Sequence, residues 1–343
     1  MKYLFWNTHK NDDINDVLSE LIIENNISMV LLAEYAANAD ELINKLAARN
    51  IDMLQYGSCS ERIKMFGRIE NIQYRMDSDH AVIRIINDKD ILCCIHLNSK
   101  IYSDHEEIRE IHMDQIIKDI QNVERELQSE NTIVVGDFNI NPYDASLINA
   151  RYFHGIPIYE EAKRKSRIIA GKEFYMFYNP MWNLLGDAQE PYGTYYYAGN
   201  DPINTYWNIY DQVIIRPALR ARFVENSLRI IKETKTRFLL DSNGHPDKKI
   251  SDHLPIVFEI KEDKHMDFRQ ITMMQKIKSG MDRFRANHPK FPMFLRAVSQ
   301  DALVEGTIIE INVTTPEGKK YCTNVKLKAD DMELFDSFKS MQG

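Results

Sequence analysis

Several polar side chains in this sequence lie at the ends of short apolar runs, where their types could perform chemistry together. A strand buried on both faces cannot hold a charge in mid-run without a large desolvation cost, whereas its end opens onto a crevice where charges can converge on a ligand. Carboxylates, amides and an imidazole in such a crevice suit metal binding and general acid–base catalysis. The residues in question are Asn7, Glu34, Asp137, Asn139, Asp252 and His253.

Each of these residues also has a purely structural interpretation. Asn7 is a common turn former, Glu34 suits the start of a helix, and Asp137 could close an Asx turn in Gly-Asp-Phe-Asn. A histidine at a strand end, such as His96 in Cys93-Cys94-Ile95-His96, is often only a hydrogen-bonded imidazole. The repetition of the pattern along one chain is what favours a shared site.

The elements that must position these residues alternate between strands and helices. Hydrophobic periodicity predicts helices at 13–25, 40–50 and 104–130. Continuous or alternating apolar runs predict strands at 3–6, 28–33, 81–86, 91–97, 132–135, 212–215 and 255–260. The polar break Asn87-Asp88-Lys89-Asp90 indicates a hairpin, whereas residues 142–208 are aromatic and irregular.

Hairpins mixed with strand–helix units make a purely parallel sheet improbable. We therefore expect an α/β (α+β) fold in which two mixed sheets face each other with helices outside. This unit should cover residues 1–263 and contain the polar residues of the expected site.

Residues 264–343 are expected to form a separate small α+β module of unknown function. Helical patterns at 268–287 and 291–303 precede a predicted hairpin at 307–313 and 321–327. The module has 13 basic and 10 acidic residues, a net charge of +3, which leaves 30 basic and 41 acidic residues, or −11, for residues 1–263. His265-Met266 at the junction is compatible with a fusion of two segments.

Composition excludes several classes of protein. The chain has 343 residues, 44% hydrophobic and 27% charged, which is typical of a globular protein and not of a disordered or collagen-like one. The four cysteines, Cys59, Cys93, Cys94 and Cys322, have no pairing or zinc-ligand spacing, and no apolar run reaches membrane-span length. We expect a cytoplasmic protein with reduced thiols and no stable membrane association. With a net charge of −8, any phosphate-rich substrate must be held by local basic groups or by metal.

An ordered set of short motifs resembles the endonuclease/exonuclease/phosphatase superfamily, which includes DNase I-like nucleases and inositol-polyphosphate phosphatases. The resemblance spans residues 1–263 and implies a four-layer αββα sandwich. The motifs are Trp6-Asn7, Leu32-Ala33-Glu34, His96-Leu97-Asn98-Ser99-Lys100, Gly136-Asp137-Phe138-Asn139, Tyr210-Asp211-Gln212 and Ser251-Asp252-His253-Leu254-Pro255.

The resemblance implies hydrolysis of a phosphate ester with Mg²⁺ or Mn²⁺, and it assigns a role to each residue. Glu34 is then the main metal ligand, with Asn7 and Asp252 as further ligands. The catalytic residues would be Asp137 for the attacking water, Asn139 for the phosphate, His253 at the scissile phosphate with Asp211 as its carboxylate partner, and His96 as a second phosphate-facing histidine.

Substrate is less well defined by the sequence. We expect a nuclease acting on DNA or RNA; the alternatives are a phosphomonoesterase or phospholipid phosphohydrolase of the same superfamily, and a binding module without turnover. The segment Trp207–Gln212 lacks the arginine of the phosphoinositide branch, and His96 stands where abasic-site endonucleases tend to have tyrosine.

Substrate contacts are expected from Asn98, Lys100 and Arg109, although a helix-surface salt bridge is the commoner role for Arg109. Two further features bear on nucleic acid. The basic run 163–167 is either a phosphate contact or a solvated surface, and the aromatic stretches 174–178 and 195–197 either stack on bases or pack in the core. Protein partners are not indicated.

Overall fold

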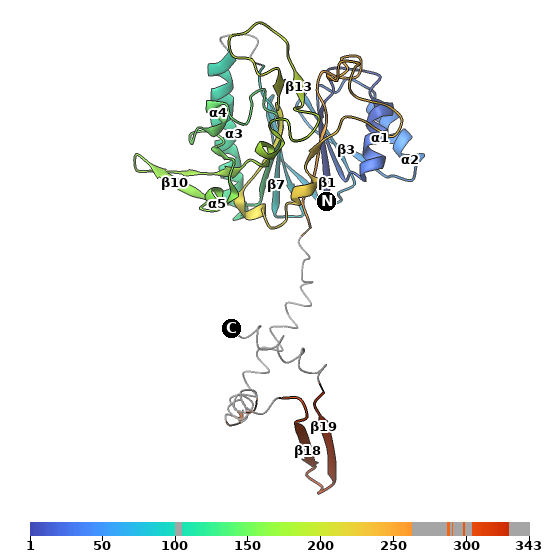
Figure 1. Cartoon of the computed structure of the whole chain (residues 1–343), viewed down its shortest axis with the longest axis vertical. Coiled ribbons are helices and arrows are strands. Elements are labelled where there is room, and N and C mark those ends of the chain that lie inside the picture. The colour runs from blue at the N-terminus through green and yellow to red at the C-terminus, as the bar shows by residue number, and fades with distance from the viewer. Residues whose placement is uncertain (100–104, 263–286, 289, 291–297, 299–303, 329–343) are drawn as a thin grey trace. The chain divides into compact units, whose positions relative to one another are not determined.

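The chain divides into two compact units, Met1–Asp263 and Lys264–Gly343. A computed structural model describes residues 1–99, 105–262, 287–288, 290, 298 and 304–328 (Figure 1). The helices predicted at 268–287 and 291–303 lie almost wholly outside the described residues. In the second unit, β18 (Ile308–Thr314) pairs antiparallel with β19 (Lys320–Lys326), so the predicted hairpin is confirmed. The functional assignment of the two units stays a prediction.

The first unit contains two large mixed sheets. One sheet has the order β16 (Arg229–Ile230), β17 (Ile256–Glu259), β1 (Lys2–Asn7), β2 (Met29–Ala33), β4 (Ile63–Gly67), β3 (Leu54–Tyr56). The other has the order β5 (Ile72–Asp77), β6 (Ala81–Ile86), β7 (Asp90–His96), β8 (Thr132–Asp137), β15 (Asp211–Ile215), β12 (Phe177–Tyr178), β9 (Gly155–Ile156). Parallel pairs occur between β1 and β2, between β7 and β8 and between β9 and β12, and the other pairs in these sheets are antiparallel.

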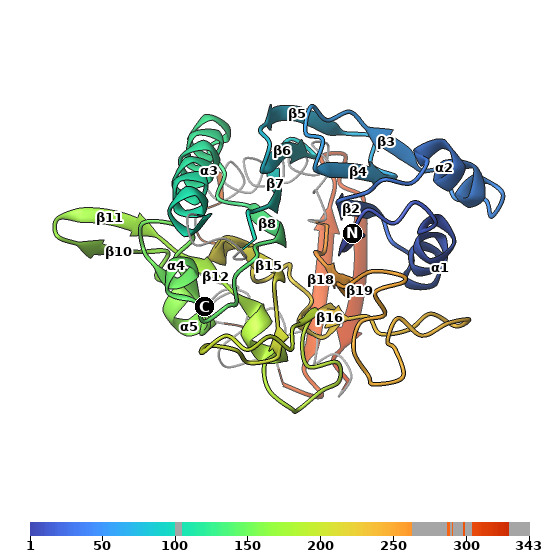
Figure 2. The same cartoon turned by 90° about the horizontal axis from the view of Figure 1, so that it is seen from above.

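Helices cover the outer face of each sheet. Figure 2 shows α1 (Asn15–Asn25) and α2 (Ala39–Ala47) beside β1 and β2, and α3 (His105–Leu127) on the opposite side beside β7 and β8. Three buried clusters separate these layers: one between the two sheets, one under α1 and α2, and one under α3. The predicted sandwich of two mixed sheets flanked by helices is confirmed.

The position of strand β1 between two buried layers explains why its sequence is a continuous apolar run. Tyr3 and Phe5 belong to the cluster between the sheets, whereas Leu4 and Trp6 pack under α1 and α2. All four side chains are at most 1% exposed. Because successive side chains of a strand point to opposite faces, a strand with a layer on each side must be apolar at every position.

The predicted elements of the two sheets are present with small differences in their bounds. The predicted hairpin is formed by β6 and β7, which pair Ile86 with Asp90 across a three-residue loop in which Asn87 and Asp88 both have positive φ. Six strands of these sheets have no counterpart among the predicted strands: β3, β4, β5, β9, β12 and β16. Strand β5 has the exposed, partly polar pattern of a sheet edge, so it lacks the hydrophobic signal on which the prediction depended.

Residues 142–230 contain short elements between the main strands. They are α4 (Ala145–Ile148), α5 (Tyr159–Ala162), β10 (Ser166–Ile169), β11 (Lys172–Tyr175), η1 (Pro180–Leu184), β13 (Tyr195–Tyr196), β14 (Trp207–Asn208), η2 (Pro217–Leu219) and η3 (Glu225–Ser227).

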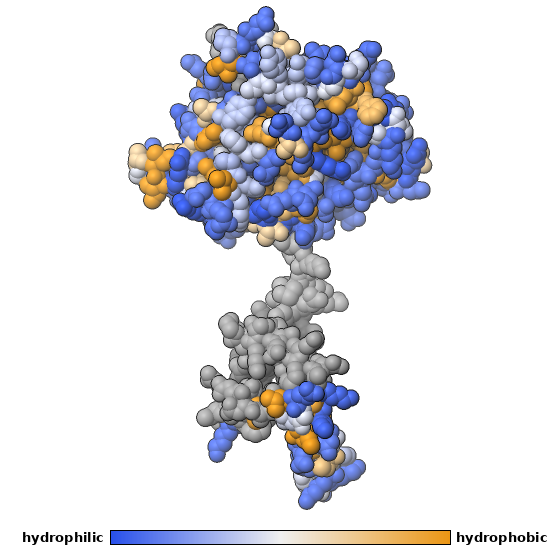
Figure 3. Space-filling model, in the orientation of Figure 1, coloured by the Kyte–Doolittle hydropathy of each residue, from blue (hydrophilic) through white to orange (hydrophobic). Residues whose placement is uncertain are grey.

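The surface of the first unit is mostly hydrophilic in the view of Figure 3, with hydrophobic residues at the tip of the β10–β11 hairpin. Ile168 there is 77% exposed. Among the helices that the structure describes, none combines the length and apolar character needed to cross a bilayer.

Replacement of Leu31, which is fully buried between the sheets, should strongly destabilise the first unit. Leu31→Ala should lower the free energy of unfolding by about 2–5 kcal/mol, because the cavity cannot fully close. Leu54→Ala, at a position 65% exposed, is the matched control and should change it by at most about 0.5 kcal/mol. Urea titration followed by tryptophan fluorescence reports on this unit alone, since all three tryptophans lie in it. Equal effects of the two variants would contradict the layer assignment.

Candidate active site

The polar residues predicted from the sequence lie at one common end of both sheets. Asn7 and Glu34 are at or just beyond the carboxyl ends of the parallel strands β1 and β2, and His96 and Asp137 are the last residues of the parallel strands β7 and β8. Strands β15 and β17 run antiparallel to β8 and β1, so their amino ends reach the same place. Asp211 begins β15 opposite Asp137, and His253 precedes β17.

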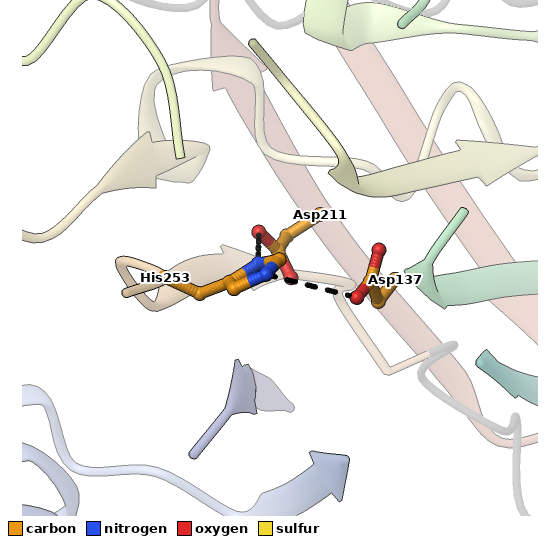
Figure 4. A group of neighbouring side chains, drawn as sticks. All are labelled: Asp137, Asp211 and His253. Atoms are coloured by element: carbon orange, nitrogen blue, oxygen red, sulfur yellow. Dashed lines mark hydrogen bonds and ion pairs between the residues drawn. The ribbon is translucent and has the colours of Figure 1, made fainter. Parts of the chain in front are cut away.

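The shortest contact of the cluster joins the imidazole of His253 to the carboxylate of Asp211. His253 Nδ1 lies 2.8 Å from Asp211 Oδ2, and both side chains are buried (Figure 4). Burial by itself lowers the pKa of His253, but the carboxylates of Asp211 and Asp137 outweigh it and hold that pKa well above its ordinary value. Burial raises the pKa of Asp211, and the neighbouring imidazole partly opposes this. The surroundings therefore favour an imidazolium at His253.

Asp137 is held at the centre of the cluster by donors on both of its oxygens. Asn7 Nδ2 donates to Asp137 Oδ2 at 2.9 Å, and the backbone N–H of Asn139 donates to Oδ1, also at 2.9 Å. His253 Nε2 is 3.9 Å from Oδ2. The Asn7 contact joins the two sheets, because β1 and β8 belong to different ones. Asp137 is thus fixed in orientation while one oxygen faces both Asn7 and the imidazole.

His96 and Glu34 extend the cluster on its other side. His96 Nε2 lies 3.5 Å from Glu34 Oε1 and 3.8 Å from Asp137 Oδ2. Burial lowers the pKa of His96, and the two carboxylates only partly oppose this. The side chain of Glu34 is 26% exposed, in contrast to Asp137 at 1%. Glu34 therefore offers a carboxylate that solvent and a ligand can reach.

Asp252 connects the cluster to His9, which was not among the predicted site residues. Asp252 Oδ1 lies 4.0 Å from His253 Nε2 and 3.1 Å from His9 Nδ1. The backbone N–H of His9 also donates to Asn7 Oδ1 at 3.0 Å. No periodicity or spacing distinguishes His9 in the sequence, since it stands in the polar segment after β1.

Backbone geometry at the strand ends supports the arrangement. Glu34 and Asn139 both have positive φ, 51° and 52°, a conformation that is uncommon for residues other than glycine and recurs at functional sites. At Gly136 an added Cβ would lie 1.9 Å from the carbonyl oxygen of Ile95, so only glycine fits there. Glycine at this position lets β8 and β7 bring Asp137 and His96 side by side.

The donors of the cluster fit a hard divalent cation better than a soft one. Asp137, Asp211 and His253 each offer a ligand atom within 4.8 Å of the others. However, an imidazole ligates a metal only when neutral, whereas the carboxylates here favour the imidazolium and Asp211 already holds its Nδ1. The oxygens of Glu34, Asp137, Asp252 and Asn7 are the donors that Mg²⁺ and Mn²⁺ prefer.

Neighbouring side chains support the cluster without having been predicted as site residues. Ser251 Oγ donates to the carbonyl of Asn7 and accepts from the N–H of His253, and Trp6 Nε1 donates to the carbonyl of His253. Thr194 Oγ1 accepts from the N–H of Asp211. Ser251 and Trp6 stand in the family-like motifs, whereas Thr194 carries no local signal because its contact depends on the tertiary fold.

The structure describes two of the three residues that were predicted to contact substrate, Asn98 and Arg109. Lys100 lies outside the described residues. Arg109 is 1% exposed and its Nη1 donates to the carbonyl of Asn98 at 3.4 Å. The helix-surface interpretation of Arg109 is therefore wrong, because α3 turns this residue inward. Direct contact of Asn98 and Arg109 with substrate stays a prediction.

The basic run and one aromatic stretch have structural roles. Arg164 and Lys165 form ion pairs with Glu161 at 3.0 Å and Glu130 at 2.7 Å, and Lys163 pairs with Glu160, which favours the solvated-surface interpretation. In the stretch 174–178, Phe177 and Tyr178 are buried in the core. By contrast, Tyr195 lies beside the cluster, with its ring centroid 4.8 Å from that of His253.

Removal of the Asp211 carboxylate should lower the pKa of His253. In Asp211→Asn the imidazole keeps its burial, which lowers the pKa, but loses the partner that raises it most. NMR titration of the His253 ring in the presence of chelator measures the shift, and Asp187→Asn, at an exposed position, is the matched control. In the wild type the imidazolium should persist to higher pH than in Asp211→Asn. An unchanged His253 titration would contradict the assigned pair.

No protein-family model matches the chain, and no curated protein matches it. Among solved structures, 89 chains match. One is an AP endonuclease from Archaeoglobus fulgidus, with 15% identity, coverage of 76% of this chain and 100% of that one, and a TM-score of 0.47. Another is a 3'-5' exonuclease (NExo) from Neisseria meningitidis, with 13% identity, the same coverage and a TM-score of 0.45.

A third match is an endonuclease/exonuclease/phosphatase family protein from Leptotrichia buccalis, with 14% identity, coverage of 76% of this chain and 100% of that one, and a TM-score of 0.46. Identities this low leave activity and substrate to be argued from this chain's own side chains. One of these similar structures carries the name of the family that the sequence motifs resemble.

Proposed function

We propose that the first unit is a divalent-metal-dependent phosphodiesterase that acts on nucleic acid. The observation that carries the proposal is the convergence of six strand ends on one buried cluster of carboxylates, amides and imidazoles. Burying so many charged groups together is costly unless they are paired or bind a ligand. Oxygen donors beside an imidazolium suit a phosphate ester held by a divalent cation.

The chain's own residues would divide the chemistry among them. Glu34, Asp252 and Asn7 would hold Mg²⁺ or Mn²⁺, which when bound neutralises negative charge on the phosphate. Asp137, fixed by Asn7 and Asn139, would orient the attacking water and accept its proton as the new P–O bond forms and the ester P–O bond breaks.

Two imidazoles would act on the phosphate itself. His253, kept cationic by Asp211, would stabilise the charge that develops on the phosphate oxygens in the transition state. His96, whose pKa is lowered by burial, would present a neutral ring on the other side of Asp137. The two histidines would thus differ in protonation, because burial dominates at His96 whereas the carboxylates of Asp211 and Asp137 outweigh burial at His253.

The preference for nucleic acid rests on an aromatic surface next to the cluster. Tyr195 is stacked on Tyr210 with centroids 5.3 Å apart and planes at 25°, and it contacts the ring of His253. Stacking on aromatic rings binds bases with little regard to sequence. A phosphate at His253 would therefore have a flat apolar surface beside it that suits a nucleobase.

Glu34→Gln should weaken binding of a divalent cation by about ten-fold or more, because an amide is a poorer ligand for a hard cation than a carboxylate. Titration of Mn²⁺ followed by electron paramagnetic resonance measures this without any turnover. Glu70→Gln, at an exposed position, is the matched control and should bind as the wild type does. Equal Mn²⁺ affinity in all three proteins would remove Glu34 from the metal site.

Asp137→Asn should lower kcat/KM for phosphodiester hydrolysis by about 10²–10⁴, the range for loss of a general base. The assay compares single-stranded and double-stranded DNA, RNA and phosphoinositides with Mg²⁺ or Mn²⁺, each with and without chelator. Asp187→Asn is the matched control. Intact nucleic acid with hydrolysed phosphoinositide would overturn the nuclease assignment, and binding of nucleic acid without hydrolysis of any phosphoester would overturn the enzyme assignment.

A further inference from the structure

A cavity opens beside the candidate active site. Its volume is about 800 Å³, within the usual range of small-ligand sites. It shares Asp252 with the catalytic cluster, and Asp252 is 4.0 Å from the imidazole of His253. The rest of the lining comes from β13 with the residues after it and from the loop before Ser251: Tyr196, Tyr197, His245, Lys248 and Lys249 are its chief side chains.

Strand β13 places aromatic rings on two sides. Tyr195 faces His253 and the active site, whereas the next residue, Tyr196, stacks on His245 with centroids 3.5 Å apart and planes at 10°. Trp207 packs edge-on against Tyr196 at 5.4 Å. The cavity therefore has a preformed aromatic wall immediately next to the residue that contacts the catalytic imidazole.

Tyr197 presents an exposed ring at the mouth of this cavity. It is 44% exposed, and its hydroxyl end lies near the carboxylate of Asp201. The same end of the ring lies against the backbone of Gly199, where an added Cβ would be 2.2 Å from the ring. A ring held at its hydroxyl end and otherwise exposed is a stacking platform that loses little freedom on binding.

The loop that carries the lysines is held in shape by its own acidic residues. Asp241 Oδ1 accepts from the N–H groups of Asn243 and His245, and Asp247 Oδ1 accepts from the N–H of Lys249. Asn11 Nδ2 donates to the carbonyl of Lys249 and so ties the loop to the segment after β1. The lysines of this loop are therefore presented by an ordered backbone.

The charges of the cavity favour one nucleotide over a longer tract of phosphates. Lys248 and Lys249 are exposed, and no ion pair joins either ammonium to a carboxylate among the described residues. Asp241, Asp247 and Asp252 lie in the same lining, so its carboxylates outnumber the two ammonium groups and would repel a longer polyanion. Two ammonium groups beside an exposed ring match one phosphate and one base.

We infer that this cavity binds a single unpaired nucleotide of the substrate strand, next to the nucleotide whose phosphate is cleaved. The inference rests on the proposed function and names its substrate more narrowly, as a single strand or a frayed end. The base stacks on Tyr197, and Lys248 and Lys249 contact its phosphate.

Binding of a fluorescein-labelled oligothymidylate of eight nucleotides, measured by anisotropy with chelator present, tests the cavity apart from turnover. Tyr197→Ala should raise the dissociation constant about ten-fold, whereas Tyr197→Phe, which keeps the ring, should restore binding. Lys248→Ala and Lys249→Ala should each weaken binding several-fold more than Lys235→Ala, an exposed lysine outside the lining.

An oligomer of the same length with abasic spacers isolates the contribution of the base. It should bind the wild type more weakly and should not distinguish Tyr197→Ala from the wild type. Equal thymidylate binding by Tyr197→Ala and the wild type, or an equal loss with the abasic oligomer, would overturn the inference. Failure of the wild type to hydrolyse any phosphodiester would overturn the proposed function instead, while Tyr197-dependent binding would still support the cavity.

Discussion

The contact between Asp211 and His253 is the interaction on which the rest of the site depends. Asp211 begins a strand of one sheet and His253 precedes a strand of the other, and their 2.8 Å contact is buried. A buried pair of this kind is favourable only when both partners are present. The two sheets must therefore keep one relative position at this end, and Asn7 with Asp137 forms a second link of the same kind.

That fixed position explains how a chain of net charge −8 could act on a phosphate polyanion. The negative charges of the cluster are arranged around one imidazolium and around oxygen donors suited to a cation, so repulsion of the substrate would fall once metal is bound. The aromatic residues of β13 then divide the adjoining surface, with Tyr195 toward His253 and Tyr196 toward the neighbouring cavity.

Much of the fold and of the polar cluster could be predicted from the sequence, because burial of a strand requires a recognisable run of apolar residues. A strand covered on both faces must be apolar throughout, so β1, β2, β7 and β8 are visible as runs and their polar ends as candidates. Edge strand β5 lacks that pattern, and the inward turn of Arg109 depends on how α3 packs. His9, Thr194 and the loop with Lys248 reach the site only through tertiary contacts, which no local spacing encodes.

We infer that oxygen donors at these strand ends hold a divalent cation for phosphodiester hydrolysis. Diffraction from crystals grown with Mn²⁺, recorded near the manganese absorption edge, would locate that cation. We expect an anomalous peak within ligand distance of the Glu34 carboxylate, with the contact between Asp211 and His253 intact. A peak bound instead by the His253 imidazole and Asp211, or no peak in the cluster at saturating Mn²⁺, would show that these oxygen donors do not form the metal site.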